Sequence, residues 1–190
     1  MTERIRRRGW FVLPEQLGDR TVDEQIRGLH WALQECKGRT VLDIGCAEGL
    51  IAFEFAKAGA SHVHGIEIVR DHIQIAYRLR DKAGLSKAVT FEVADLAALP
   101  APTKQYDIVL ALAVVHKLKD PAIGVRYCAA ACRDLFVIRM SKGAKQNTTI
   151  KSKRYAASCN VTEEMRRAGF KLERIEAGPR EEPVIYYRKC

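Results

Sequence analysis

The sequence predicts an α/β fold: a mostly parallel, doubly wound sheet with helices packed on both of its faces. Short apolar runs and amphipathic helical runs alternate from residue 40 to residue 139, which is the pattern of repeated strand–helix–strand units. The chain has 190 residues, 47% of them hydrophobic, enough for one domain with a continuous core. A glycine-rich turn follows the first strand of the series, where open α/β sheets form a ligand crevice.

A helix is expected near the N-terminus. The run from Thr21 to Glu24 has the capping-box pattern, and Ile26, Leu29 and Leu33 follow at helical spacing, which predicts a helix over 21–36. Residues 1–37 are therefore expected to form an N-terminal extension ahead of a main domain over 38–190.

The main domain begins with the alternating series and ends differently. The series predicts strands at 40–45, 62–68, 89–93, 106–112 and 134–139 and helices at 50–58, 71–83 and 121–132. Behind it we expect a helix over 162–168 and an antiparallel hairpin made by 170–175 and 184–187, because a Gly- and Pro-containing turn separates those two apolar runs. The polar, lysine-rich stretch 141–158 is expected to be a long loop.

The glycine-rich turn indicates what kind of ligand the crevice holds. It reads GCAEG from Gly45 to Gly49, which fits neither the G-x-G-x-x-G of a dinucleotide loop nor the G-x-x-x-x-G-K-[ST] of a P-loop. Asp43 and Glu48 would repel phosphates. The loop therefore favours a ligand with positively charged groups.

This loop resembles the first motif of the class I S-adenosylmethionine-dependent methyltransferases, strand-D/E-x-G-x-G-x-G, with Ala47 at the middle glycine. The cofactor of that family carries an ammonium and a sulfonium group. An alanine is tolerated at this place if its φ is negative. The resemblance implies that Asp43, Gly45, Cys46, Ala47 and Gly49 bind S-adenosylmethionine.

Two later strand ends extend the resemblance. Glu67 ends the second strand 22 residues after Gly45, where the family uses an acid to accept both ribose hydroxyls. Asp95 ends the third strand, where an acid accepts from the adenine amino group. Ile68 and Leu96 follow these two acids and are expected to bind the same cofactor.

The segment 106–121 resembles the family's fourth-strand pattern FDxVxxxxxxHHLxDP, with Lys117 at the second histidine. Its His116 is the candidate general base toward an acceptor hydroxyl or amine. The alternative is a histidine that packs on the cofactor or caps the following helix. The resemblance also implies a seven-stranded sheet whose last strand is antiparallel, with the C-terminal hairpin supplying the last two strands.

Three motifs that specify other methyl acceptors are missing from the sequence, which reduces the set of possible acceptors. They are the N/D-P-P-Y/F/W segment of base-amine methylation, a cysteine nucleophile for cytosine C5, and the Lys-Asp-Lys-Glu tetrad of ribose methylation. O- or N-methylation of a small molecule is expected, slightly ahead of RNA. RNA stays open because the net charge is +9 and segments 4–8 and 142–154 are basic. The extension over 1–37 could fold over the active site as a substrate lid, as in many members of this family.

Two other function classes stay open. One is a non-catalytic methyltransferase-like binding subunit, and the other is a nucleotide-dependent oxidoreductase. The oligomeric state is not predicted. A cytoplasmic protein is expected because the sequence has neither a secretory signal nor an apolar run near the ~20 residues that cross a bilayer. The six cysteines show no disulfide or zinc spacing, so we expect reduced thiols and no metal site.

Overall fold

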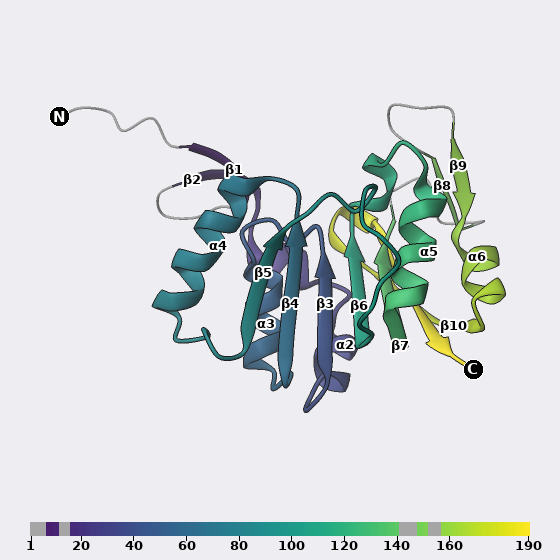
Figure 1. Ribbon diagram of the computed structural model, residues 1–190, viewed down its shortest axis with the longest axis horizontal. Helices are drawn as coiled ribbons and strands as arrows, with labels where there is room; N and C mark the ends of the chain where they lie inside the picture. The colour runs from purple at the N-terminus through teal and green to yellow at the C-terminus, as the bar shows by residue number, and fades with distance from the viewer. Residues whose placement is uncertain (1–6, 12–15, 141–147, 152–156) are drawn as a thin grey trace.

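Seven strands form one sheet in this computed structural model, which describes residues 7–11, 16–140, 148–151 and 157–190 (Figure 1). The strand order is β10-β11-β7-β6-β3-β4-β5. The parallel strands are β3 (Thr40–Ile44), β4 (His62–Glu67), β5 (Val89–Val93), β6 (Tyr106–Leu112) and β7 (Cys132–Arg139). The hairpin of β10 (Phe170–Ala177) and β11 (Pro183–Lys189) adds the two antiparallel strands. The predicted fold class is confirmed.

The sheet reverses its strand order at β3. This strand pairs with β4 on one side and β6 on the other, so that Asp43 lies opposite both Gly65 and Leu110. Helices that leave β3 and β6 must then pass to different faces, and a crevice opens outside the carboxyl end of β3. The glycine-rich turn lies at this reversal point.

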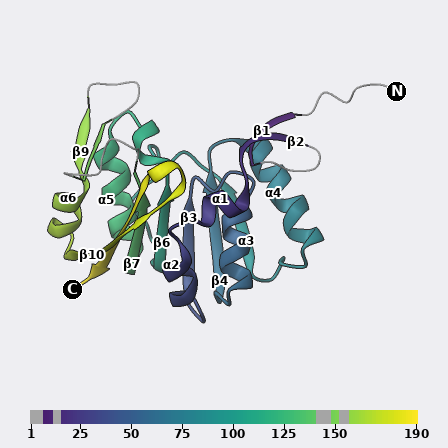
Figure 2. The same cartoon turned by 180° about the vertical axis from the view of Figure 1, so that it is seen from behind.

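Helices cover both faces of the sheet. One core packs beneath α2 (His30–Glu35), α3 (Leu50–Lys57) and α4 (Arg70–Lys82), and the other beneath α5 (Pro121–Ala131) and α6 (Val161–Arg167). Figure 2 shows α2 and α3 on the side of the sheet that Figure 1 hides. Neighbouring strand residues alternate between the two cores, since side chains along a strand point to opposite faces: Val41 packs in the first and Leu42 in the second.

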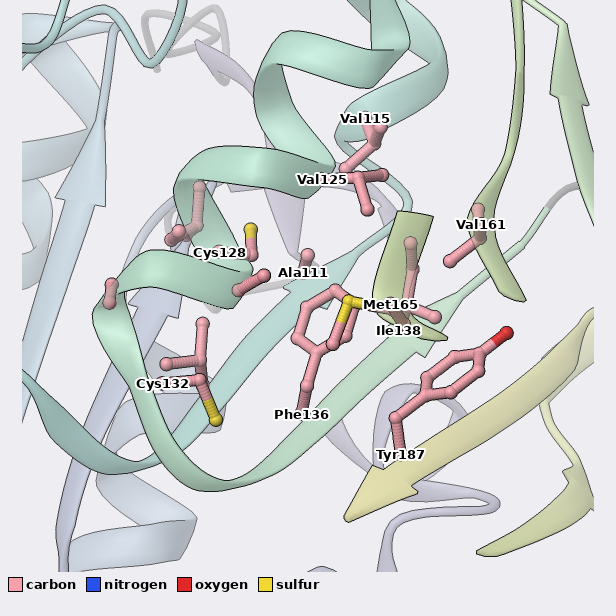
Figure 3. Close-up of a cluster of buried hydrophobic side chains, with 14 of the residues drawn as sticks. Ala111, Val115, Val125, Cys128, Cys132, Phe136, Ile138, Val161, Met165 and Tyr187 are labelled. Atoms are coloured by element: carbon pink, nitrogen blue, oxygen red, sulfur yellow. The ribbon is translucent and has the colours of Figure 1, made fainter. Parts of the chain in front are cut away.

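The second core contains two of the cysteines. Figure 3 shows Cys128 and Cys132 in the same cluster of buried side chains as Phe136 and Tyr187. Burial raises the pKa of the Cys128 thiol, and raises that of Cys132 to about 12. All six cysteines are free thiols, and these two serve the core as small apolar side chains.

The helix predicted over 21–36 is wrong, because it is broken in two. The capping box on Thr21 and Glu24 is present, but α1 (Val22–Ile26) stops before Gly28, and α2 begins at His30. Gly28 has φ +78°, and a Cβ there would stand 3.0 Å from the Ala177 carbonyl oxygen. Contact with the C-terminal hairpin therefore requires glycine and ends the helix.

The prediction of a long loop over 141–158 is also wrong in part. Within it, β8 (Thr149–Lys151) pairs antiparallel with β9 (Ser158–Asn160). Ile150 and Cys159 are buried against the second core. Residues 141–147 and 152–156 of that stretch lie outside the described residues, and with them most of the basic segment 142–154, as does most of segment 4–8.

One further strand pair was not predicted. Ahead of α1, β1 (Arg7–Phe11) pairs with β2 (Gln16–Arg20). Figures 1 and 2 show this pair, like β8 and β9, beyond the carboxyl ends of the parallel strands. This strand pair is thus on the side of the sheet where the crevice opens. In the described part of the chain, no helix combines the length and apolarity that a membrane span requires.

Candidate active site

A cavity of about 700 Å³ opens at the carboxyl edge of the sheet. Four chain segments line it: the glycine-rich turn, the end of β4 with the start of α4, the turn after β5, and the segment after β6. Of the residues predicted from the sequence, those that line the cavity are Gly45, Ala47, Glu67, Ile68, Asp95 and Leu96. Those outside its lining are Asp43, Cys46, Gly49 and His116.

The backbone of the glycine-rich turn is held in a left-handed conformation. Gly45, Ala47 and Gly49 have φ of +75°, +48° and +79°. The amides of Gly45 and Cys46 both donate to the Ile66 carbonyl, at 2.8 and 3.1 Å, which anchors the turn on β4. The condition that φ be negative at Ala47 is therefore wrong, and alanine occupies a conformation that glycine adopts more easily.

Replacing this alanine tests the strain. Ala47→Gly should leave the free energy of unfolding unchanged or raise it by up to about 1 kcal/mol, because relief of the left-handed strain offsets the greater freedom of glycine in the unfolded chain. Ala56→Gly, in the regular helix α3, should instead cost about 1 kcal/mol. Urea unfolding of both variants measures the contrast. Equal losses would mean that Ala47 is not strained.

Glu67 is fixed in place by two backbone amides. Its Oε2 accepts from the Ala47 amide at 3.1 Å and its Oε1 from the Val69 amide at 3.0 Å. Each carboxylate oxygen has further lone pairs, so Glu67 can still accept from a ligand. The same side chain thus links the glycine-rich turn to the start of α4 and presents acceptors to the cavity.

Asp95 is the second acid of the cavity. One oxygen, Oδ1, accepts from the Ala97 amide at 2.9 Å, and the side chain is otherwise exposed. Beside these acids lie apolar surfaces: Ile68 and Val69 are 60% and 41% exposed, whereas Leu96 is buried. The cavity therefore combines acceptor-only groups with apolar walls, which suits a partly aromatic ligand that carries N–H and O–H donors.

Asp43 lies in β3, just before the glycine-rich turn. It is 2% exposed, and its Oδ2 has no hydrogen-bond partner in the part of the chain that the structure describes. Burial, and then the nearby Glu67 charge, raise the pKa of the Asp43 carboxyl to about 7, while the Arg139 guanidinium opposes the shift. A cation placed beside Asp43 would favour its charged form. Burial also raises the pKa of the adjacent Cys46 thiol, which makes Cys46 a packing residue rather than a nucleophile.

His116 lies in the short 3-10 helix η1 (Val115–Lys117) and is 5% exposed. The neighbouring Lys117 lines the cavity, as does Lys119. The structure therefore presents the two lysines to the cavity and buries the histidine behind them. A base role for His116 stays a prediction, and its burial favours the alternative of a packing residue.

Sequence reasoning missed several cavity residues. The most informative is His72 in the first turn of α4, whose Nε2 lies 3.6 Å from the Oε1 of the fully buried Glu48. The topology could have indicated His72, because the first helical turn after a strand that ends in an acid faces the crevice of an open sheet. Lys119 occupies an unspecified position of the pattern at 106–121, and only the fold shows that it lines the cavity.

Comparison with known proteins decides the family. A family model described as a methyltransferase domain matches residues 35–177, most of the chain. The chain belongs to this family. The matched range includes every residue predicted to bind the cofactor, from Asp43 to Leu96. The resemblance to the class I S-adenosylmethionine-dependent methyltransferases is thereby confirmed.

Curated relatives in this family are about one third identical over part of the chain. A ubiquinone biosynthesis O-methyltransferase from Methylocella silvestris is 33% identical over 112 residues, 57% of this chain and 43% of the relative. The 27-O-demethylrifamycin SV methyltransferase from Amycolatopsis mediterranei is 35% identical over 96 residues, 50% of this chain and 35% of the relative. The chain thus spans less than half the length of these relatives.

Solved structures agree with the fold. The magnesium protoporphyrin IX methyltransferase from Synechocystis PCC 6803, with bound S-adenosylmethionine, aligns with a TM-score of 0.67 at 18% identity, covering 85% of this chain and 76% of its own. A [4+2]-cyclase, SpnF, aligns with a TM-score of 0.65 at 18% identity, covering 85% and 80%. At this identity the alignments establish the fold alone.

Proposed function

We propose that this chain transfers a methyl group from S-adenosylmethionine to the oxygen or nitrogen of a small-molecule acceptor. The observation that carries the proposal is that Glu67 and Asp95, from the ends of two neighbouring strands, line the same cavity as the left-handed glycine-rich turn. Membership in the methyltransferase family supports the reaction type.

The residues of the cavity fit this cofactor. Glu67 would accept from the ribose hydroxyls and Asp95 from the adenine amino group, while Ile68 and Leu96 offer apolar surface to the adenine ring. The buried Asp43 would favour the cationic end of the ligand through its charge. When bound, the cofactor supplies an electrophilic methyl group. The chain then has to align an acceptor lone pair with that methyl group and keep water out.

The names of the relatives support a small acceptor. They include two O-methyltransferases of biosynthetic small molecules and an ajmaline N-methyltransferase from Rauvolfia serpentina, 34% identical over 86 residues. Lys117 and Lys119 on the cavity wall would favour an acceptor that carries negative charge.

The test is transfer of labelled methyl from S-adenosylmethionine to pools of small metabolites and, in parallel, to total RNA. Label in a metabolite and not in RNA is the expected result. Label only in RNA would replace the small-molecule proposal with RNA modification. Binding of the cofactor without transfer to either pool would support a non-catalytic binding subunit. Binding of NAD in its place would favour an oxidoreductase.

Removing the ribose acceptor should weaken cofactor binding. Glu67→Ala is expected to lower the affinity for S-adenosylhomocysteine by about 1 to 3 kcal/mol, because two hydroxyls lose a charged acceptor. Glu92→Ala is the matched control, since Glu92 is exposed on the adjacent strand and outside the cavity lining. Calorimetry on both folded variants measures the difference. Unchanged affinity in Glu67→Ala would remove Glu67 from the cofactor site.

A further inference from the structure

Two lysines line the cavity on the segment that follows β6. Lys117 ends the 3-10 helix η1, and Lys119 stands two residues further along the chain. Both residues are exposed, and Lys119 makes no ion pair with any residue that the structure describes. Cations of one sign on a cavity wall raise the local concentration of anions. These two residues, the lysine pair, are therefore the part of the cavity that is complementary to an anionic ligand.

The backbone of the lysine pair is held in place. Leu118, between the two lysines, donates its amide to the Val115 carbonyl at 3.2 Å and packs against the second core. A Cβ at Gly124 would stand 2.5 Å from Cδ1 of Leu118, so the leucine lies directly on α5. The next acid, Asp120, caps α5 by accepting from the Ala122 amide at 2.9 Å. The lysine pair thus projects from a segment that is anchored on α5.

The acids of the cavity come from other strands than the lysine pair. Glu67 ends β4 and Asp95 follows β5, whereas the lysine pair follows β6. In the sheet, β3 with its glycine-rich turn lies between β4 and β6. The cavity therefore draws its acids and its lysines from opposite sides of β3. The acids suit the N–H and O–H donors of an adenosine, which leaves the lysine pair for another ligand group.

The charges of the cofactor do not match the lysine pair. The sulfonium and the ammonium of S-adenosylmethionine are both repelled by lysines. An anionic acceptor in the same cavity would be attracted by the lysine pair and by the sulfonium alike. Apolar Val114 and Leu118 line the cavity next to the lysines. The complementary ligand is therefore an anion that also has an apolar part.

We propose that the lysine pair selects the methyl acceptor, and that the acceptor is a small organic anion. Lys117 and Lys119 bind its carboxylate or phosphate, and Val114 and Leu118 contact its apolar part. The inference rests on the proposed function, since it takes the acceptor to bind in the same cavity as the cofactor. Its new element is the substrate class, because a neutral acceptor of the same shape binds less tightly.

The experiment compares three probes on the chain saturated with S-adenosylhomocysteine. Benzoate and benzamide have nearly the same shape and differ in charge, and phenyl phosphate presents a phosphate instead of a carboxylate. Calorimetry at low salt should show that at least one of the two anions binds about threefold more tightly than benzamide, or better. The tighter of the two anions distinguishes a carboxylate acceptor from a phosphate acceptor. Because the lysines are exposed, this preference should shrink as the salt concentration rises.

Replacing both lysines should remove the preference for anions. Lys117→Gln combined with Lys119→Gln should lower the affinity for the anion about three- to tenfold and leave that for benzamide within about twofold, because two exposed cations are lost. Lys82→Gln is the matched control, since Lys82 is an exposed lysine in the last turn of α4 and lies outside the cavity lining. It should change neither affinity.

Two results would overturn the inference: anions that bind no more tightly than benzamide, and a preference for anions that survives in the double variant. A double variant that loses affinity for S-adenosylhomocysteine, but not for 5′-methylthioadenosine, which lacks the amino-acid end, would instead assign the lysine pair to the cofactor. A wild-type chain that does not bind S-adenosylhomocysteine would contradict the proposed function. The three probes, measured on the ligand-free chain, would in that case still test the lysine pair.

Discussion

Gly49→Ala is expected to lower the free energy of unfolding by about 2–5 kcal/mol and to disrupt the glycine-rich turn. Gly49 has φ +79°, and a Cβ there would stand 2.5 Å from Cζ of Phe91. The Phe91 ring cannot easily move aside, because Phe53 and Tyr77 pack edge-on against it at centroid distances of 5.9 and 5.6 Å. Left-handed strain of about 1–2 kcal/mol and overpacking of about 1–3 kcal/mol then add.

A second glycine separates the two contributions. Gly84 has a similar φ of +70°, but a Cβ there would meet nothing within 4 Å. Gly84→Ala should therefore cost only the strain, about 1–2 kcal/mol. Urea unfolding of both variants measures the difference, which reports the contact with Phe91. A loss in Gly49→Ala no larger than in Gly84→Ala would show that the Phe91 ring yields.

The strands and the acids of the site could be predicted because both follow from local patterns. Apolar runs of strand length identified all seven strands of the sheet. Parallel strands bring their carboxyl ends to one edge, so the acids at the ends of two strands had to meet there. Glu67 and Asp95 accordingly line one cavity, although 28 residues separate them in the sequence.

The errors occurred where distant contacts decide local structure. Gly28 ends the first helix because the hairpin, some 150 residues further on, approaches its backbone: Ala177 contacts it, and the Tyr186 hydroxyl donates to its carbonyl. No pattern near residue 28 contains that information. Ile150, in the polar stretch 141–158, likewise becomes part of a strand because it is buried against the second core.

The site shows the same division. A motif indicates which residues surround a ligand, but not which of them reach it and which support those that do. Asp43 precedes the glycine-rich turn, Cys46 and Gly49 belong to it, and none of the three lines the cavity, whereas His72, which no motif contains, does. Whether a motif residue contacts the ligand or only supports the residues that do depends on the burial of its side chain, which only the folded structure defines.

Asp43 should make cofactor binding depend on pH around neutrality. Burial and the Glu67 charge raise the pKa of its carboxyl to about 7, and a cationic ligand end favours the ionised form. Below pH 7, binding therefore has to release a proton. The affinity for S-adenosylhomocysteine should fall by up to about tenfold per pH unit below 7. Asp43→Asn should remove this dependence and bind more weakly at pH 8.

The same carboxyl should affect stability in the opposite direction. Between about pH 4 and about pH 7, Asp43 is protonated in the ligand-free folded chain but ionised in the unfolded chain. Its contribution to stability is therefore fully present below pH 4 and is lost as the pH rises to 7. At about 1.4 kcal/mol for each pH unit between the ordinary and the raised pKa, this rise is linked to about 4 kcal/mol of stability. Asp43→Asn should therefore be more stable than the wild type at pH 8 by an amount of that order, and equal to it near pH 4.

Asp107 provides a control of opposite sign. Burial alone would raise the pKa of the Asp107 carboxyl, but hydrogen bonds from Thr40 and Arg133 outweigh this effect and lower the pKa. Its stabilising effect is thus present above the ordinary pKa of an aspartate and is lost as the pH falls through the lowered value. Asp107→Asn should destabilise the chain at pH 8, with a loss that shrinks in acid, and leave the pH dependence of cofactor binding intact. Thermal unfolding at pH 4, 6 and 8 measures both variants, and a destabilised Asp43→Asn at pH 8 would contradict the raised pKa of Asp43.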